Sequence, residues 1–294
     1  MLTSRFIGSE QWGGKVDGRA KQRTKIGISL AYYLLTGIAR RLRQWAGYPA
    51  PHRLVILLYH SVPLALRASF ARQLDMLAAR VSVVPADYRG AAAHGGLSVA
   101  ITFDDALTSV LDNALPELRA RNMPATIFVP AGSLNARPAW WDTKVEDKSA
   151  YGEELVATAD ALRSLLSERV QLGAHSLTHP HLSRLRLEDA RREIAGCRAH
   201  MRDIFGIDIQ TFAFPYGEHD AALVALCREA GYERVFTVVP TVVDPAKEEF
   251  IRGRVEVNPG DGPLEFYLKM SGAYAWMVYA SAIKDRFRWR QRRT

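Results

Sequence analysis

Seven short apolar segments recur along this chain, and they constrain its fold more than any other feature. Each has the length of a strand and alternates with a stretch of helical pattern, and most are hydrophobic almost without interruption. Such continuous hydrophobicity is typical of strands covered on both faces, as in a parallel sheet or barrel. The predicted strands are Leu54–Tyr59, Val99–Phe103, Ala125–Val129, Val170–Ala174, Thr211–Phe214, Arg234–Val239 and Ile251–Val257.

The clearest predicted helix runs from Leu187 to Ile204, where apolar residues follow a 3-4-3-4-3 spacing and charged residues occupy the other side. It should cover a sheet with one face. Asp220 is expected to cap a helix that begins near Ala221, and Gly231 to end it. Alternating strands and helices indicate parallel strands joined by right-handed crossovers. Seven strands favour a distorted or incomplete barrel, while a flat doubly wound sheet stays open.

The formal charge of +8 is concentrated at the two ends of the chain. Residues 1–50 carry a net +7 and residues 284–294 a net +5, which leaves −4 for the 233 residues between them. A nucleic-acid groove would spread positive charge over the folded part, so no nucleic-acid partner is expected. Basic ends with apolar and aromatic residues favour an anionic membrane surface.

The apolar run 26–39 (IGISLAYYLLTGIA) lies between Lys25 and the pair Arg40-Arg41. Its 14 residues fall short of the roughly 20 that span a bilayer. Basic residues follow it where a signal peptide would be cleaved, so an uncleaved interfacial helix is favoured over a helix docked on the folded domain. The sequence thus divides into a basic, partly apolar segment 1–50, a catalytic domain 51–262, and an amphipathic basic helix and tail 263–294.

The only two cysteines, Cys197 and Cys227, fall in helix-like segments. They cannot form a disulfide framework, and buried free thiols are favoured over a single bridge.

Polar side chains follow four of the predicted strands, where functional groups gather in parallel α/β folds. In chain order these are Tyr59-His60, Asp104-Asp105, His175, and Pro215-Tyr216.

Two of these clusters suit a metal ion. The adjacent carboxylates of Asp104 and Asp105 would repel each other unless a cation is present, although one of them could instead cap the next helix. His175 and His179 stand four residues apart, so one helical turn would place both imidazoles on one face. One carboxylate and two imidazoles suit a divalent ion with positions left for water and substrate. Taken singly, each cluster has an ordinary structural explanation.

The segments TFDD, HSLTH and FAFPYG, in this order and on these strands, resemble the polysaccharide deacetylase family (NodB homology, carbohydrate esterase family 4). The resemblance covers roughly residues 53–257. It implies a distorted (β/α)7 barrel with a bound divalent metal, commonly zinc, that hydrolyses N- or O-acetyl groups on polymers such as poly-N-acetylglucosamine, chitin, peptidoglycan or xylan.

The resemblance implies a role for each residue that matches the family's motifs. Asp105, His175 and His179 would be the metal ligands, and Asp104 would be the base that takes a proton from the attacking water. Pro215 and Tyr216 belong to the Pro-Tyr motif, in which the backbone N–H of the tyrosine contributes to the oxyanion site. A positioned carboxylate base typically accelerates a reaction about 10²–10⁴-fold.

The chain departs from the usual family pattern at two points. Ala213 stands where the motif has an arginine, and Arg254 is the candidate replacement that orients Asp104, with Arg252 as its competitor. No C-terminal Leu-x-His motif supplies a general acid. A circularly permuted subgroup, similar to exopolysaccharide deacetylases of biofilm systems, takes the acid from an early Tyr-His motif, which makes His60 in LLYHSV the candidate here. A structural histidine is the alternative.

The stretch 131–153 lacks periodicity and carries two adjacent tryptophans, Trp140 and Trp141. A loop of this kind over a barrel mouth could stack on sugar rings, and packing under the loop is the alternative.

The expected function is metal-dependent removal of acetyl groups from N-acetylated sugars in an exopolysaccharide or cell-envelope glycan. The alternatives are deacylation or deformylation of a lipid-linked sugar, and a catalytically silent carbohydrate-binding protein on the same fold. Zn²⁺ is the expected cofactor, N-acetylated polysaccharide or lipid-linked glycan the expected partner, and a membrane of the bacterial cell envelope the expected location.

Overall fold

The computed structural model describes residues 18–90, 96–140, 154–167 and 169–280. The strands are β1 (Arg53–Tyr59), β2 (Ser82–Val83), β3 (Leu97–Phe103), β4 (Ala125–Val129), β5 (Val170–Ala174), β6 (Thr211–Ala213), β7 (Arg234–Thr237), β8 (Ile251–Gly253) and β9 (Val255–Glu256). The α-helices are α2 (Arg19–Trp45), α3 (Arg67–Ala78), α4 (Leu115–Ala120), α5 (Ala159–Ser164), α6 (Leu187–Phe205), α7 (Ala221–Glu229) and α8 (Pro263–Met270).

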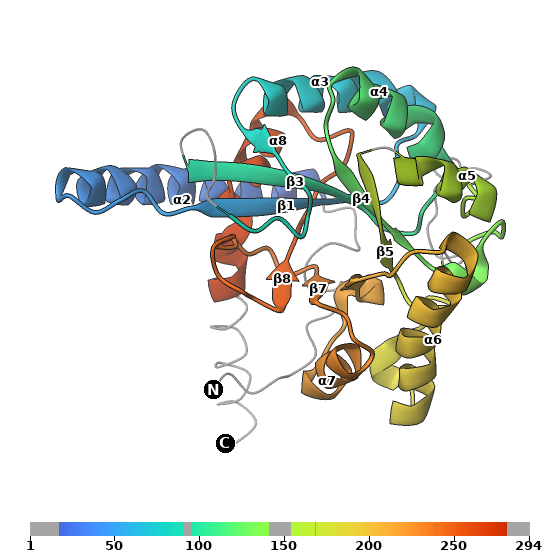
Figure 1. Ribbon diagram of the computed structural model, residues 1–294. Coiled ribbons are helices and arrows are strands. Elements are labelled where there is room, and N and C mark those ends of the chain that lie inside the picture. Colours follow the sequence, from blue (N-terminus) through green and yellow to red (C-terminus); the bar gives the residue numbers. More distant parts are fainter. Residues whose placement is uncertain (1–17, 91–95, 141–153, 168, 281–294) are drawn as a thin grey trace.

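The strands form one parallel sheet whose two ends are joined by a single stretch of chain. Their order is β8-β7-β6-β5-β4-β3-β1-β9, with the short β2 beside β3. β8 pairs with β7, β9 pairs with β1, and only Arg254 separates β8 from β9. The sheet therefore closes through Arg254 into a barrel with helices around it (Figure 1). The predicted distorted (β/α)7 barrel is confirmed, and the flat doubly wound sheet is wrong.

Three predicted strands end earlier than expected. The segment 251–257 is two strands rather than one, because the chain changes its pairing partner at Arg254. β6 ends at Ala213 because Pro215–Gly217 forms a tight turn, η7. β7 ends at Thr237, two residues before the predicted end.

Helix α6 covers the outside of the barrel as its spacing predicted. The buried side chains on its inner face are Ala190, Ile194, Cys197, Met201 and Phe205. The side chain of Asp220 caps α7 by accepting a hydrogen bond from the backbone N–H of Leu223 (2.8 Å). Both cysteines are buried and free, as predicted.

The two predicted end segments are partly built into the barrel. α8 begins at Pro263, and its Phe266, Leu268 and Met270 are buried in the same core as the strands. α2 packs against α8 and the following turn η8 (Ala273–Ala275). Residues 1–17 of the first predicted end segment and residues 281–294 of the second lie outside the described residues. Among the helices described, none has the length and apolarity to cross a membrane.

Candidate metal centre and active site

The site lies at the carboxyl ends of β1, β3, β5 and β6. β1 and β3 run in register so that Tyr59 pairs with Phe103, and the backbone N–H of Asp104 donates to the Tyr59 carbonyl at 2.9 Å. The next residues along these two strands, His60 and Asp104, are therefore neighbours. The strand ends bring polar clusters that are far apart in the sequence to one edge of the barrel.

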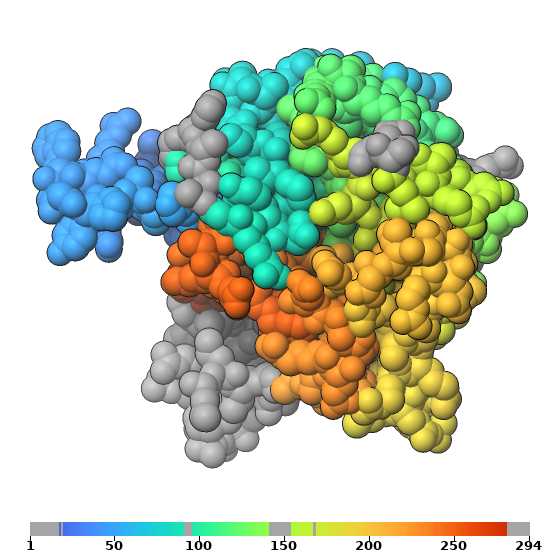
Figure 2. Space-filling view, viewed as in Figure 1, coloured from blue at the N-terminus to red at the C-terminus, as the bar shows by residue number. Residues whose placement is uncertain are grey.

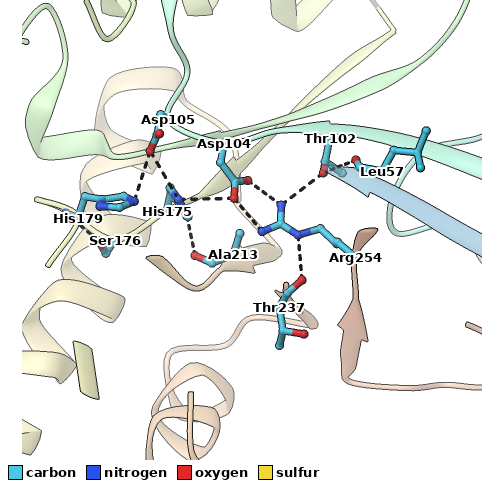
Figure 3. A network of polar contacts seen from close by, with 10 residues as sticks. All are labelled: Leu57, Thr102, Asp104, Asp105, His175, Ser176, His179, Ala213, Thr237 and Arg254. Atoms are coloured by element: carbon cyan, nitrogen blue, oxygen red, sulfur yellow. Dashed lines mark hydrogen bonds and ion pairs between the residues drawn. The ribbon is translucent and has the colours of Figure 1, made fainter. Parts of the chain in front are cut away.

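Asp105, His175 and His179 converge on one point (Figure 3). One potential ligand atom from each lies within 4.8 Å of the other two. Asp105 Oδ1 is 3.3 Å from His179 Nε2 and 3.8 Å from His175 Nε2. His175 Nδ1 lies 2.8 Å from the Ala213 carbonyl oxygen, which fixes Nδ1 as the donor and leaves the lone pair on Nε2. A ligating histidine is commonly held in this way.

The electrostatics of these three side chains fit a cation. All are buried. Burial and the neighbouring charge of Asp104 raise the pKa of the Asp105 carboxyl, although His60 and His175 partly oppose this. Burial and the nearby histidines lower the pKa of His179 well below its usual value, which favours the neutral imidazole that metals bind.

Two of the buried polar atoms, Asp105 Oδ1 and His179 Nδ1, have no hydrogen-bond partner among the described residues. A buried carboxylate oxygen without a donor is costly unless a cation faces it. The donor set of one carboxylate and two imidazoles therefore fits a divalent metal ion.

The backbone is strained where the candidate ligands are attached. Seven non-glycine residues in the described ranges have a positive φ, and five of them belong to the site. Such conformations cost about 1–3 kcal/mol each and persist where the surroundings enforce them. The five are Asp105 (φ 68°), Ala106 (51°), Ser176 (61°), His179 (59°) and Tyr216 (56°).

The loop that carries His179 is held from two sides. Ser176 Oγ accepts a hydrogen bond from the His179 backbone N–H at 3.0 Å. From α6, Glu193 accepts hydrogen bonds from the backbone N–H groups of Leu177 and Thr178, both at 2.9 Å, and from the Thr178 hydroxyl at 2.8 Å. These contacts fix the loop in the conformation that directs His179 toward Asp105.

Arg254 binds Asp104 with both arms of its guanidinium (Figure 3). Arg254 Nη1 is 2.6 Å from Asp104 Oδ1, and Nη2 is 2.8 Å from Oδ2. Arg254 also donates to the Thr237 carbonyl and contacts the Thr102 hydroxyl. Burial opposes ionisation of Asp104, but Arg254 and His175 outweigh it and lower the pKa of that carboxyl. Asp104 is therefore an oriented carboxylate, 3.8 Å from His175 Nε2.

The competing arginine, Arg252, lies elsewhere. It is fully buried and donates to the backbone carbonyls of Ala86 and Tyr88. His60 is half-buried after β1, and its charge is among the influences that favour the ionised forms of Asp104 and Asp105.

The aromatic candidates surround His179. Tyr216, in the Pro215–Gly217 turn, stacks on His181 with ring centroids 3.9 Å apart and meets His179 edge-on at 4.8 Å. Burial, with Asp105 and Glu218 nearby, raises the pKa of Tyr216 to about 12. Trp140 stacks on His179 at 4.4 Å, so part of its ring covers this candidate ligand. Trp141 lies outside the described residues.

Sequence reasoning missed the supports of the metal ligands. Ser176 stands three residues before His179, a spacing at which a serine side chain can bond the backbone, so a signal for it existed. Glu193 and the Ala213 carbonyl carried no such signal, because their contacts depend on how α6 and β6 pack beside β5.

Comparison with known proteins shows which family and which solved structures this chain is similar to. A polysaccharide deacetylase family model matches residues 92–235, which include the metal cluster, Asp104 and Tyr216. YxkH of Bacillus subtilis (strain 168) is 22% identical over 162 residues, 55% of this chain and 52% of YxkH. Poly-beta-1,6-N-acetyl-D-glucosamine N-deacetylase of Escherichia coli (strain K12) is 26% identical over 209 residues, 59% of this chain and 30% of that enzyme.

The chain thus spans about half or less of the length of these relatives. Among solved structures, IcaB from Ammonifex degensii has a TM-score of 0.61 and 25% identity, covering 76% of this chain and 98% of that one. The Streptococcus pyogenes deacetylase PplD, solved with acetate, has a TM-score of 0.62 and 15% identity, covering 75% of this chain and 99% of that one. At 15% identity, the likeness to PplD shows a shared fold.

Proposed function

Because this chain belongs to the polysaccharide deacetylase family, we propose that it hydrolyses acetyl groups from N-acetylated sugars of an exopolysaccharide or cell-envelope glycan. The observation that carries the proposal is the paired arrangement of a metal-binding cluster and a separately held carboxylate. Asp105, His175 and His179 form the cluster, and Arg254 holds Asp104 beside it.

Asp105, His175 and His179 are the proposed ligands of the metal, with Zn²⁺ as the proposed ion because a carboxylate and two imidazoles suit it. When bound, such an ion polarises the acetyl carbonyl and makes a water molecule more acidic. The remaining chemistry belongs to the side chains around it.

Asp104 acts as the general base. Its two oxygens are held by Arg254, so the carboxylate keeps one orientation and stays ionised at neutral pH. It takes the proton of the attacking water, and Arg254 serves as its positioning residue. A carboxylate bound by two charged hydrogen bonds is a weak base, so Asp104 would rely on a bound metal to make the water more acidic.

The backbone N–H of Tyr216 is the proposed oxyanion donor, because Tyr216 lies in a tight turn with a left-handed backbone and its ring contacts His179 of the ligand cluster. Oxyanion donors of this kind contribute about 3 kcal/mol each in acyl-transfer enzymes. His60 is the proposed general acid that protonates the leaving amine. Pro215, Trp140 and Trp141 are the proposed sugar contacts.

A linear N-acetylated glucosamine polymer is the proposed substrate. Support comes from the 26% identity to an enzyme named for poly-beta-1,6-N-acetyl-D-glucosamine and from the 25% identity to IcaB over 76% of the chain. Location in the bacterial cell envelope is proposed on the same ground.

The direct test is acetate release from soluble poly-N-acetylglucosamine oligomers by the full chain, before and after removal of metal by a chelator. The proposal predicts release that stops on chelation and returns with added Zn²⁺. Release that is unaffected by complete metal removal would contradict the proposed mechanism.

The same assay separates the alternatives. A lipid-linked sugar deacylase would release its acyl group from an undecaprenyl-linked substrate and leave soluble oligomers intact. A silent carbohydrate-binding protein would bind metal and oligomers without releasing acetate from either substrate.

A further inference from the structure

Helix α2 is fastened to the barrel along one face of its first half. Gln22 Nε2 donates to Glu265 at 2.7 Å, and the Tyr33 hydroxyl lies 2.6 Å from that of Tyr267 on α8. Trp276 Nε1 donates to the fully buried Ser29 at 2.8 Å. These contacts end at Tyr33, although α2 continues for twelve more residues to Trp45. Figure 2 shows the blue end of this segment projecting from the rest of the surface.

The opposite face of α2 carries a ridge of exposed apolar side chains. Ile38 stands nine residues after the buried Ser29, which at 100° per residue is half a turn away. Leu35 is 67% exposed, Leu42 57%, and Trp45 at the helix end 89%. The ridge consists of Ile28, Leu30, Leu34, Leu35, Ile38, Leu42 and Trp45, all exposed. Contiguous apolar surface of this kind on a protein marks a site of interaction.

The charge of α2 indicates what the ridge meets. Between Arg19 and Trp45 the sequence has seven Lys or Arg residues and no Asp or Glu. At 100° per residue, Arg23 and Arg41 lie within one edge of the ridge, between Leu30 and Leu34, and Lys21 lies just beyond Ile28 at the other edge. Long cationic side chains in these positions can reach lipid headgroups. A helix with an apolar ridge, basic edges, a terminal tryptophan and no acidic residue complements an anionic lipid surface. A protein partner would need acidic groups along both edges.

We propose that α2 is a fixed interfacial anchor that lays its apolar ridge into an anionic lipid surface while its other face stays docked on the barrel. The projecting end lies on the side where β1 and β3 begin, whereas the metal cluster lies at their carboxyl ends (Figure 1). Binding there leaves the site uncovered, so membrane binding and hydrolysis of soluble oligomers are separable.

The test is sedimentation of the full chain with vesicles of phosphatidylcholine containing 30% phosphatidylglycerol, and with vesicles of phosphatidylcholine alone. The chain should bind the anionic vesicles, and 0.5 M NaCl should weaken that binding. Leu35→Glu with Leu42→Glu should lower the partition coefficient about tenfold per substitution, because each removes a leucine from the lipid contact. Leu187→Glu, at a residue 54% exposed on α6, is the matched control and should bind like the wild type.

Equal binding of the double variant and the wild type would overturn the proposal, as would failure of the wild type to bind anionic vesicles. A wild-type dimer in solution that the double variant dissociates, with unchanged vesicle binding, would assign the ridge to a second copy instead. Circular dichroism of each variant checks folding. Acetate release from soluble oligomers should be unchanged in the double variant. If neither the wild type nor any variant releases acetate, the proposed function is contradicted and the proposed anchor is not.

Discussion

Arg254 and Arg252 are both fully buried arginines on the last segment of the barrel, yet only Arg254 contacts Asp104. Arg254→Lys keeps the positive charge but removes the bidentate hydrogen bonding to Asp104. We expect kcat for acetate release to fall at least about tenfold with metal content unchanged. Arg252→Lys, the control, should keep wild-type kcat. Wild-type kcat in Arg254→Lys would show that the guanidinium does not position the base.

Asp104→Asn tests the base itself. The amide keeps the shape of the side chain but cannot take a proton from water, so turnover should fall about 10²–10⁴-fold. Metal content should stay at the wild-type level, because Asp105, His175 and His179 are untouched. The measurements are acetate release and metal analysis on the same folded sample. An active Asn variant would refute the assigned role.

At this scale the sequence predicted that Asp104, Asp105, His175 and His179 would lie close together, and the structure brings them to one edge of the barrel, because the strand ends meet there whatever the loop details. Their roles as ligands and base stay predictions. The sequence favoured Arg254 over Arg252 but gave no physical reason to exclude Arg252. The two stand two residues apart on one apolar segment, and only the closure of the sheet at Arg254 decides which side chain faces Asp104.

At the scale of elements, Glu193 connects helix α6 to the loop that carries His179, because it accepts three hydrogen bonds from Leu177 and Thr178. Glu193→Ala should release the loop and weaken metal affinity about 10–100-fold, as for other groups that support ligands. Glu193→Gln retains an acceptor for the two N–H groups and should restore most of the affinity. Calorimetric Zn²⁺ titration is the measurement. Unchanged affinity in the Ala variant would show that the loop keeps its conformation without Glu193.

Helix α6 itself was predictable almost to the residue, since its spacing fixes which face is buried. The strained loop was not. The 175–179 spacing suggested a helical turn, whereas Ser176 and His179 have left-handed backbone angles that depend on contacts from α6 and from within the loop.

For the whole molecule, the closed barrel followed from seven apolar segments, but the split of the last one did not. The alternation of uncharged and charged residues runs through Arg254 without a break, and only the ring closure assigns the two halves to β7 and β1. For α2 the sequence favoured an interfacial helix over a helix docked on the folded domain. The structure shows docking in its first half, made by polar contacts that a hydrophobic pattern does not reveal and by packing of Ile26, Tyr32 and Tyr33 against the core.

Burial of both thiols gives a prediction for the intact fold. Burial raises the pKa of Cys197 to about 12, and it also raises the pKa of Cys227, so at pH 8 both are protonated and shielded. Because the thiolate is the reactive form, iodoacetamide should leave both cysteines unmodified in the native chain and label both after unfolding. Mass spectrometry measures the labelling. Rapid labelling of either cysteine in the native chain would contradict the packing of α6 or α7.

Zinc titration of the metal-free chain tests the central claim most directly. We expect one equivalent to bind the wild type and His181→Ala, since His181 is paired with Glu218 outside the cluster. His179→Ala should weaken binding by more than about 100-fold and abolish acetate release. One tightly bound equivalent in His179→Ala, or none in the wild type, would contradict the account.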